Sequence, residues 1–130
     1  MENRAVLKVS LKEAIRKWLE LTRPFNRLTN QEIDFLTVLL YHRHLIAREV
    51  KSEIYLSKIL FGTELRKQLR EDMGFSPQTF LNILSNLRKK GAIVNDTIKK
   101  SYIPNIPLDY EGATYRIVFD IKISDSYAKR

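Results

Sequence analysis

The 130-residue chain is 44% hydrophobic and 29% charged, a balance that is typical of one globular domain and argues against a disordered protein. It contains no cysteine, which excludes disulfides and thiolate metal sites. The chain has no apolar run long enough to cross a bilayer, and its N-terminus lacks the apolar core of a secretory signal, so we expect a cytoplasmic protein. The formal charge of +8 indicates either a polyanionic partner or a lysine-rich surface that maintains solubility.

The charge excess is concentrated in two segments, residues 1–30 and 63–90. The first segment predicts a helix near 10–22, because Ser10 and Glu13 have the spacing of a capping box and Pro24 closes the segment. Its apolar face is expected to contain Leu11, Ala14, Ile15 and Trp18.

Two further helices are predicted before residue 62. Thr29 and Glu32 repeat the capping-box spacing, and the residues that follow are apolar around most of the helix, which indicates a central, buried helix. A third helix is predicted near 50–60, ending at Gly62.

Residues 63–94 predict a short helix, a glycine turn and a second helix. Thr63 is expected to cap the short helix, and Gly74 to end it. Ser76 is expected as the N-cap of the second helix, with Pro77 at its first position and Gly91 as its terminator. The face that this helix buries should consist of Phe80, Ile83, Leu84 and Leu87.

The last third of the chain predicts β-structure. Residues 92–94 begin a strand, and apolar and polar residues alternate over 115–123, as in a half-buried strand. A strand near 97–103 is expected to pair with 115–123, with a loop over 104–112 between them.

The stretches MGFS, SPQTF and LRKKGAIV resemble the turn, recognition helix and exit strand of the winged helix-turn-helix family of DNA-binding domains. The resemblance implies a mainly α fold with a small antiparallel β-hairpin (α+β). It also implies an N-terminal helical extension over 1–28, a winged helix-turn-helix domain over 29–124 and a basic tail over 125–130.

The family resemblance further implies a non-catalytic protein that binds duplex DNA, a small transcriptional regulator or replication accessory with helix 77–90 in the major groove. Carried over to this chain, it places beside the bases or backbone Pro77 and the base-reading candidates Gln78, Thr79, Asn82, Ser85 and Asn86. Its phosphate-binding candidates are Arg66, Lys67, Arg70, Arg88, Lys89, Lys90, Lys99, Lys100 and Arg116.

This helix offers side chains that can contact adenine, but it lacks the commonest guanine contact. Gln78 and Asn82 are four residues apart and therefore on one face, and an amide bound to adenine contributes about 1–3 kcal/mol of discrimination. Residues 77–87 contain no Arg or Lys for a guanine contact. The loop over 104–112 is acidic, and an acidic loop would repel a phosphate backbone. Leu81, on the same helix, suits a thymine methyl or an apolar pocket on another protein.

The alternative is a structural adaptor that uses the same scaffold for protein contacts in a large assembly, such as a phage virion. Its interface candidates are Leu81, Leu7, Leu11 and Trp18. The stripe on the N-terminal helix could form a homodimer contact, or it could fold inward in a monomer.

Catalysis, metal binding and cofactor binding have no support in the sequence. His42 and His44 are two residues apart, a spacing that places them on different faces of a helix, and no phosphate-cradling glycine loop occurs. We therefore expect no enzyme activity, no metal site and no cofactor.

Overall fold

The computed structural model describes residues 8–109 and 122–124. Leu7, Arg116, most of the predicted strand at 115–123 and the tail at 125–130 lie outside the described residues. The helices are α1 (Leu11–Leu21), α2 (Arg23–Asn26), α3 (Asn30–Glu49), α4 (Glu53–Leu60), α5 (Thr63–Met73) and α6 (Pro77–Lys89). Strands β1 (Ile93–Val94) and β2 (Thr97–Ile98) and a 3-10 helix (Lys100–Tyr102) follow. The predicted mainly α fold with a small antiparallel hairpin is confirmed.

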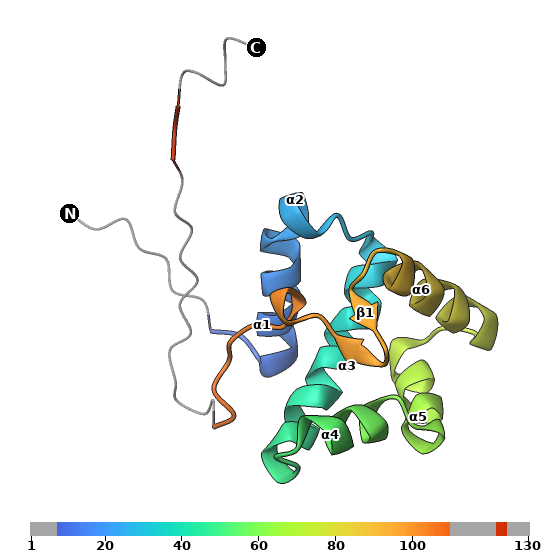
Figure 1. The fold of residues 1–130 in the computed structure, drawn as a ribbon. Helices are drawn as coiled ribbons and strands as arrows, with labels where there is room; N and C mark the ends of the chain where they lie inside the picture. The colour runs from blue at the N-terminus through green and yellow to red at the C-terminus, as the bar shows by residue number, and fades with distance from the viewer. Residues whose placement is uncertain (1–7, 110–121, 125–130) are drawn as a thin grey trace.

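Helix α3 is the centre of the fold, with α1 on one side and α4, α5 and α6 on the other (Figure 1). The sequence predicts this position correctly, because α3 is apolar around most of its girth. Its aromatic contact to α6 joins Phe35 and Phe80, whose ring centroids lie 5.0 Å apart. The buried residues of α3 are Glu32, Ile33, Phe35, Leu36, Thr37, Val38, Leu39 and Leu40. No helix in the described part of the chain has the length and apolar character needed to span a bilayer.

Helix α1 turns its apolar stripe inward against α3. Leu11, Ile15 and Leu19 are buried in the same core as α3, and Arg16 forms an ion pair with Asp34 of α3 at 2.7 Å. The predicted capping box of Ser10 and Glu13 is confirmed. The stripe could form a homodimer contact or fold inward, and Leu11 folds inward. This residue is only 6% exposed, so it is not available as an interface residue.

Two helix starts differ from the prediction. Residues after α1 form α2, because Pro24 lies in its first turn, where the missing N–H is not needed. The predicted cap at Thr63 is wrong: Gly62 is the N-cap and Thr63 is already helical. A Cβ at Gly62 would lie 2.9 Å from the carbonyl oxygen of Lys58, so glycine lets the chain turn closely past the last turn of α4.

The turn and the ends of α6 follow the sequence prediction. Gly74 has φ 72° and ends α5, and the Ser76 hydroxyl accepts the N–H of Thr79 at 3.2 Å as the N-cap of α6. Gly91 has φ 77°, and the N–H of Ala92 donates to the carbonyl of Leu87 at 3.0 Å. This bonding satisfies the last carbonyls of α6 and turns the chain into β1.

The structure contains a hairpin that the sequence analysis does not predict, whereas the predicted pairing with 115–123 falls mostly outside the described residues. Strand β2 pairs with β1, with Ile93 opposite Ile98 and Val94 opposite Thr97. Asn95 has φ 50° and the next residue, Asp96, has φ 56°. Two positive φ values suit a two-residue turn that matches the twist of antiparallel strands. The expected strand over 97–103 is consequently limited to 97–98, and residues 100–102 form the 3-10 helix.

A half-buried ion pair, in which the carboxylate is the buried partner, joins the end of α6 to the start of α3. The Lys90 ammonium donates to the Glu32 carboxylate and to the carbonyl oxygen of Arg27, the latter at 2.9 Å. The same carboxylate accepts the N–H of Thr29 at 2.8 Å, completing the predicted capping box. Burial raises the pKa of Glu32, but the bonds from Lys90 and Thr29 outweigh it, so the pKa lies below its ordinary value.

Replacing Lys90 should destabilise the protein far more than replacing its neighbour. Lys90→Ala leaves the Glu32 carboxylate buried without its cation, and we expect a loss of roughly 2–3 kcal/mol in the free energy of unfolding. Lys89→Ala, at an exposed position, should change it by less than about 0.5 kcal/mol. Urea unfolding measures both; equal losses would contradict the assigned role of Lys90.

The contribution of Glu32 should depend on pH. Because its pKa is lowered by folding, the ionised carboxylate stabilises the protein above the unfolded pKa, and this stability is lost as the pH falls through the folded pKa. The difference in unfolding free energy between wild type and Glu32→Gln should therefore shrink below about pH 4. Urea unfolding across pH 3–7, as a rough window, tests this; a constant difference would contradict it.

Candidate nucleic-acid interface

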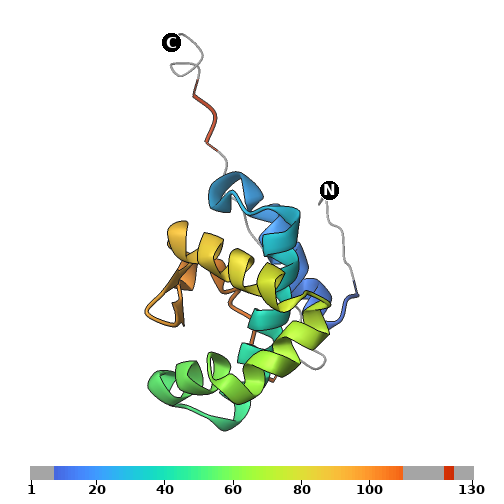
Figure 2. The same cartoon turned by 90° about the vertical axis from the view of Figure 1, so that its right-hand side faces the viewer.

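The outer face of α6 is a polar surface that the fold leaves open to solvent. Gln78, Asn82, Ser85 and Lys89 follow at i, i+4, i+7 and i+11, so they share one side of the helix, and all four are exposed. The opposite side is buried, as predicted, through Phe80, Ile83, Leu84 and Leu87. We call the four exposed residues the outer face of α6. Figure 2 shows this helix beside the hairpin, with which it is in contact through β1.

Two base-reading candidates on the outer face are joined to each other. The Gln78 side chain donates from Nε2 to Oδ1 of Asn82 at 2.9 Å. This bond restricts the rotamers of both amides, so less side-chain entropy is lost when they bind a partner. The two amides therefore act as one ordered polar unit.

The other base-reading candidates are less well placed. Thr79 is half-buried, and its hydroxyl accepts from the Ser76 hydroxyl at 2.9 Å, so it belongs to the cap of α6. Asn86 is exposed on the edge of the outer face, one residue after Ser85. Pro77 is exposed at the first position of the helix.

The three cations at the end of α6 have different surroundings. Arg88 forms an ion pair with Asp96 at the hairpin tip, with a nitrogen–oxygen distance of 3.3 Å. Lys90 is bonded to Glu32, so its expected role as a phosphate ligand is not supported: its ammonium is used inside the fold. Lys89 is exposed on the outer face and is the cation of this group best placed for a phosphate.

Further cations lie on the neighbouring elements. On α5, Lys67 is exposed, whereas Arg66 and Arg70 are half-buried, and Arg66 lies against the apolar seam that contains Phe80 and Leu84. Lys99 and Lys100 are exposed directly after β2, where the chain leaves the hairpin. The remaining phosphate candidate, Arg116, lies outside the described residues.

The electrostatics of α6 suit an anion. The sequence contains no Asp or Glu from Met73 to Asn95, so the whole of α6 carries only neutral and basic side chains. The first acidic residue after it, Asp96, is partly neutralised by Arg88. A phosphate backbone approaching the outer face therefore meets no carboxylate on α6 itself.

The three interface candidates in the described residues differ in how far they are exposed to solvent. Leu81 is 48% exposed beside the outer face, in contrast to the buried Leu11. Trp18 of α1 is half-buried and packs against the core.

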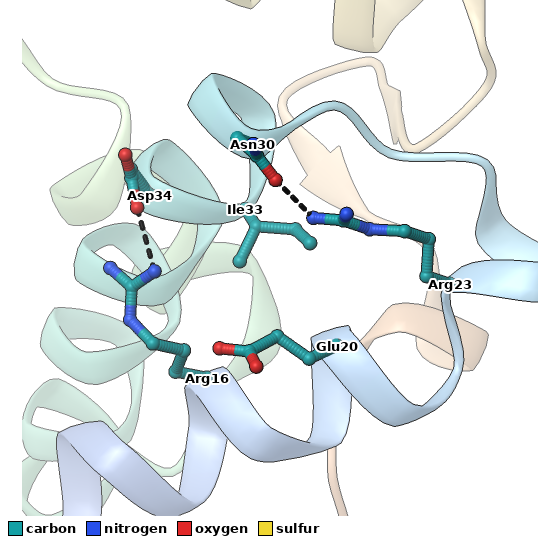
Figure 3. Close-up of a pocket in the computed structure, with 6 residues that line it drawn as sticks. All are labelled: Arg16, Glu20, Arg23, Asn30, Ile33 and Asp34. Carbon is teal, nitrogen blue, oxygen red and sulfur yellow. Dashed lines mark hydrogen bonds and ion pairs between the residues drawn. The ribbon is translucent and has the colours of Figure 1, made fainter.

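A surface pocket of about 480 Å³ lies between α1 and α3. Its two arginines are already engaged, Arg16 with Asp34 at 2.7 Å and Arg23 with Asn30 at 2.6 Å (Figure 3). The pocket also contains the carboxylate of Glu20, which makes it less suited to a phosphate than the outer face of α6.

The two histidines of α3, His42 and His44, have different surroundings in the structure. His42 is bonded to Asp72 of α5 at 2.9 Å, and within residues 8–109 and 122–124 no three potential metal ligands come together. Burial and the nearby Arg48 lower the pKa of His44, which favours its neutral form.

Sequence reasoning missed the residues that position the outer face. Glu32 was recognised as part of a capping box, but its bond to Lys90 joins positions 58 apart in the sequence. The hairpin tip had a local signal, because Asn and Asp tolerate positive φ and lie between the short apolar runs of β1 and β2.

Comparison with protein-family models, with curated proteins and with solved structures found no match to this chain.

Proposed function

We propose that this protein binds duplex DNA without catalysis, as a small cytoplasmic regulator or replication accessory of the winged helix-turn-helix type. The observation that carries the proposal is the outer face of α6: an exposed, acid-free polar face on the second helix of a helix-turn-helix, between a glycine turn and a hairpin. A helix presented in this way fits the major groove, which admits one α-helix.

The surrounding elements support the proposal. The N-terminal turn of α6 is free of acidic residues and follows Gly74, while Lys89, Lys99 and Lys100 lie exposed at the opposite end and beside the hairpin. In this arrangement the outer face contacts base edges, and the lysines bind the phosphates on either side of the groove.

The proposal predicts salt-dependent binding. Fluorescence anisotropy of a labelled mixed-sequence duplex should give an association constant whose logarithm falls linearly with the logarithm of salt concentration. Lys89→Ala should weaken binding to all duplexes and reduce the magnitude of the slope by about 1, as expected for one lost phosphate contact. Lys17→Ala, which removes an exposed lysine of α1, is the matched control and should leave the slope unchanged. Absence of binding at low salt would refute the proposal.

A second candidate function is a structural adaptor, and the exposure of Leu81 favours it. A leucine that is 48% exposed beside polar residues could insert into an apolar pocket of another subunit.

Leu81 separates the two candidates. If the face binds protein, sedimentation velocity should detect self-association of the wild type, and Leu81→Asp should return the chain to a monomer because it buries a carboxylate in the contact. Gln78→Ala should then have little effect. A monomeric wild type that binds duplex DNA would instead support the DNA function.

A further inference from the structure

We propose that the outer face of α6 selects A·T base pairs, with the Gln78–Asn82 unit reading the N6 and N7 edge of adenine. This inference rests on the proposed duplex binding and adds to it the class of sequence that is recognised.

The hydrogen bond inside the unit determines which atoms it can offer. Each amide has one carbonyl acceptor and one NH2 donor group. The bond from Nε2 of Gln78 to Oδ1 of Asn82 leaves Oε1 of Gln78 and Nδ2 of Asn82, which carry no other hydrogen bond within the described part of the chain. Whichever amide donates, one carbonyl oxygen and one NH2 group stay outside the internal bond, while the two bonded groups keep only one N–H and one lone pair.

Adenine is the base whose major-groove edge matches this pair. It presents the N7 acceptor and the N6 amino donor side by side, so it needs one donor and one acceptor from the protein. Guanine presents two acceptors, N7 and O6, and needs two donors, while cytosine presents a single amino donor. The two groups outside the internal bond therefore match adenine at both positions, whereas guanine would need its second donor from Nε2 of Gln78, which is already bonded to Asn82.

The cations that would favour guanine are absent or engaged elsewhere. Residues 77–87 contain no Arg or Lys. Beyond them, Arg88 is paired with Asp96, and Lys90 is bonded to Glu32. Lys89 lies about 16 Å along the helix axis from Gln78, too far to contact the same base.

Leu81 supplies an apolar contact beside the unit. It precedes Asn82, is 48% exposed, and lies on the edge of the outer face. Thymine is the base with a methyl group in the major groove, which an apolar side chain can contact. Leu81 and the amide unit thus favour the same class of base pair.

The test begins with selection. Duplexes with a randomised central segment are selected for binding to the full chain, and the selected sites should be enriched in A·T pairs. The winning duplex is then resynthesised with 7-deazaadenine, which replaces N7 by carbon and keeps Watson–Crick pairing. Wild-type affinity should fall about tenfold, the size expected for loss of a bidentate base contact.

Variants assign the effect to the unit. The double variant Gln78→Ala, Asn82→Ala should bind the adenine and 7-deazaadenine duplexes equally. Gln68→Ala, which removes an exposed amide on α5, should keep the wild-type ratio. Circular dichroism shows whether the variants are folded. The affinities of the wild-type protein for the two duplexes test adenine reading even if a variant does not fold.

The outcomes distinguish this inference from the proposed function. Salt-dependent duplex binding with G·C enrichment, or with no loss on 7-deazaadenine, would overturn adenine reading while leaving duplex binding intact. No binding to any duplex at low salt would overturn both.

Discussion

The Glu32 carboxylate holds the start of α3 and the end of α6 in one place. It accepts hydrogen bonds from the backbone N–H of Thr29, the N-cap of its own helix, and from the Lys90 ammonium just after α6, and it is only 2% exposed. A buried carboxylate is unfavourable unless such partners are present, so α3 and α6 are held in the arrangement that supplies them. The second bond from Lys90, to the carbonyl of Arg27, also orders the loop before α3.

This link determines what α6 exposes. With Phe80 packed on Phe35 at one end and Lys90 held by Glu32 at the other, the helix cannot rotate about its axis, and the outer face stays directed to solvent. The bonds made by Gly91 and Ala92 then place the hairpin beside α6. Lys90 thus holds α6 in place, and the exposed Lys89 remains available to bind a partner.

The sequence was sufficient where the determinants are local. Capping boxes, the prolines and glycines and the 3.6-residue apolar period predict α1, α3 and α6 correctly, and Ser76 and Gly74 have their expected roles. It was insufficient where distant residues meet. The bonds of Lys90 to Glu32 and of Arg88 to Asp96 engage two predicted phosphate ligands within the fold, and no helix or strand period encodes these bonds. The β1–β2 hairpin was not predicted, because the long alternating run at 115–123 outweighed the two-residue turn at 95–96.

We propose that the outer face of α6 is the surface that contacts DNA. Titration of isotope-labelled protein with a duplex, followed by NMR, tests this proposal, because the side-chain NH2 groups of Gln78 and Asn82 and the backbone amides of 78–89 give separate signals. If the outer face of α6 binds the duplex, these signals shift and those of α1 do not. Shifts concentrated on α1 or α4, with α6 unchanged, would contradict it.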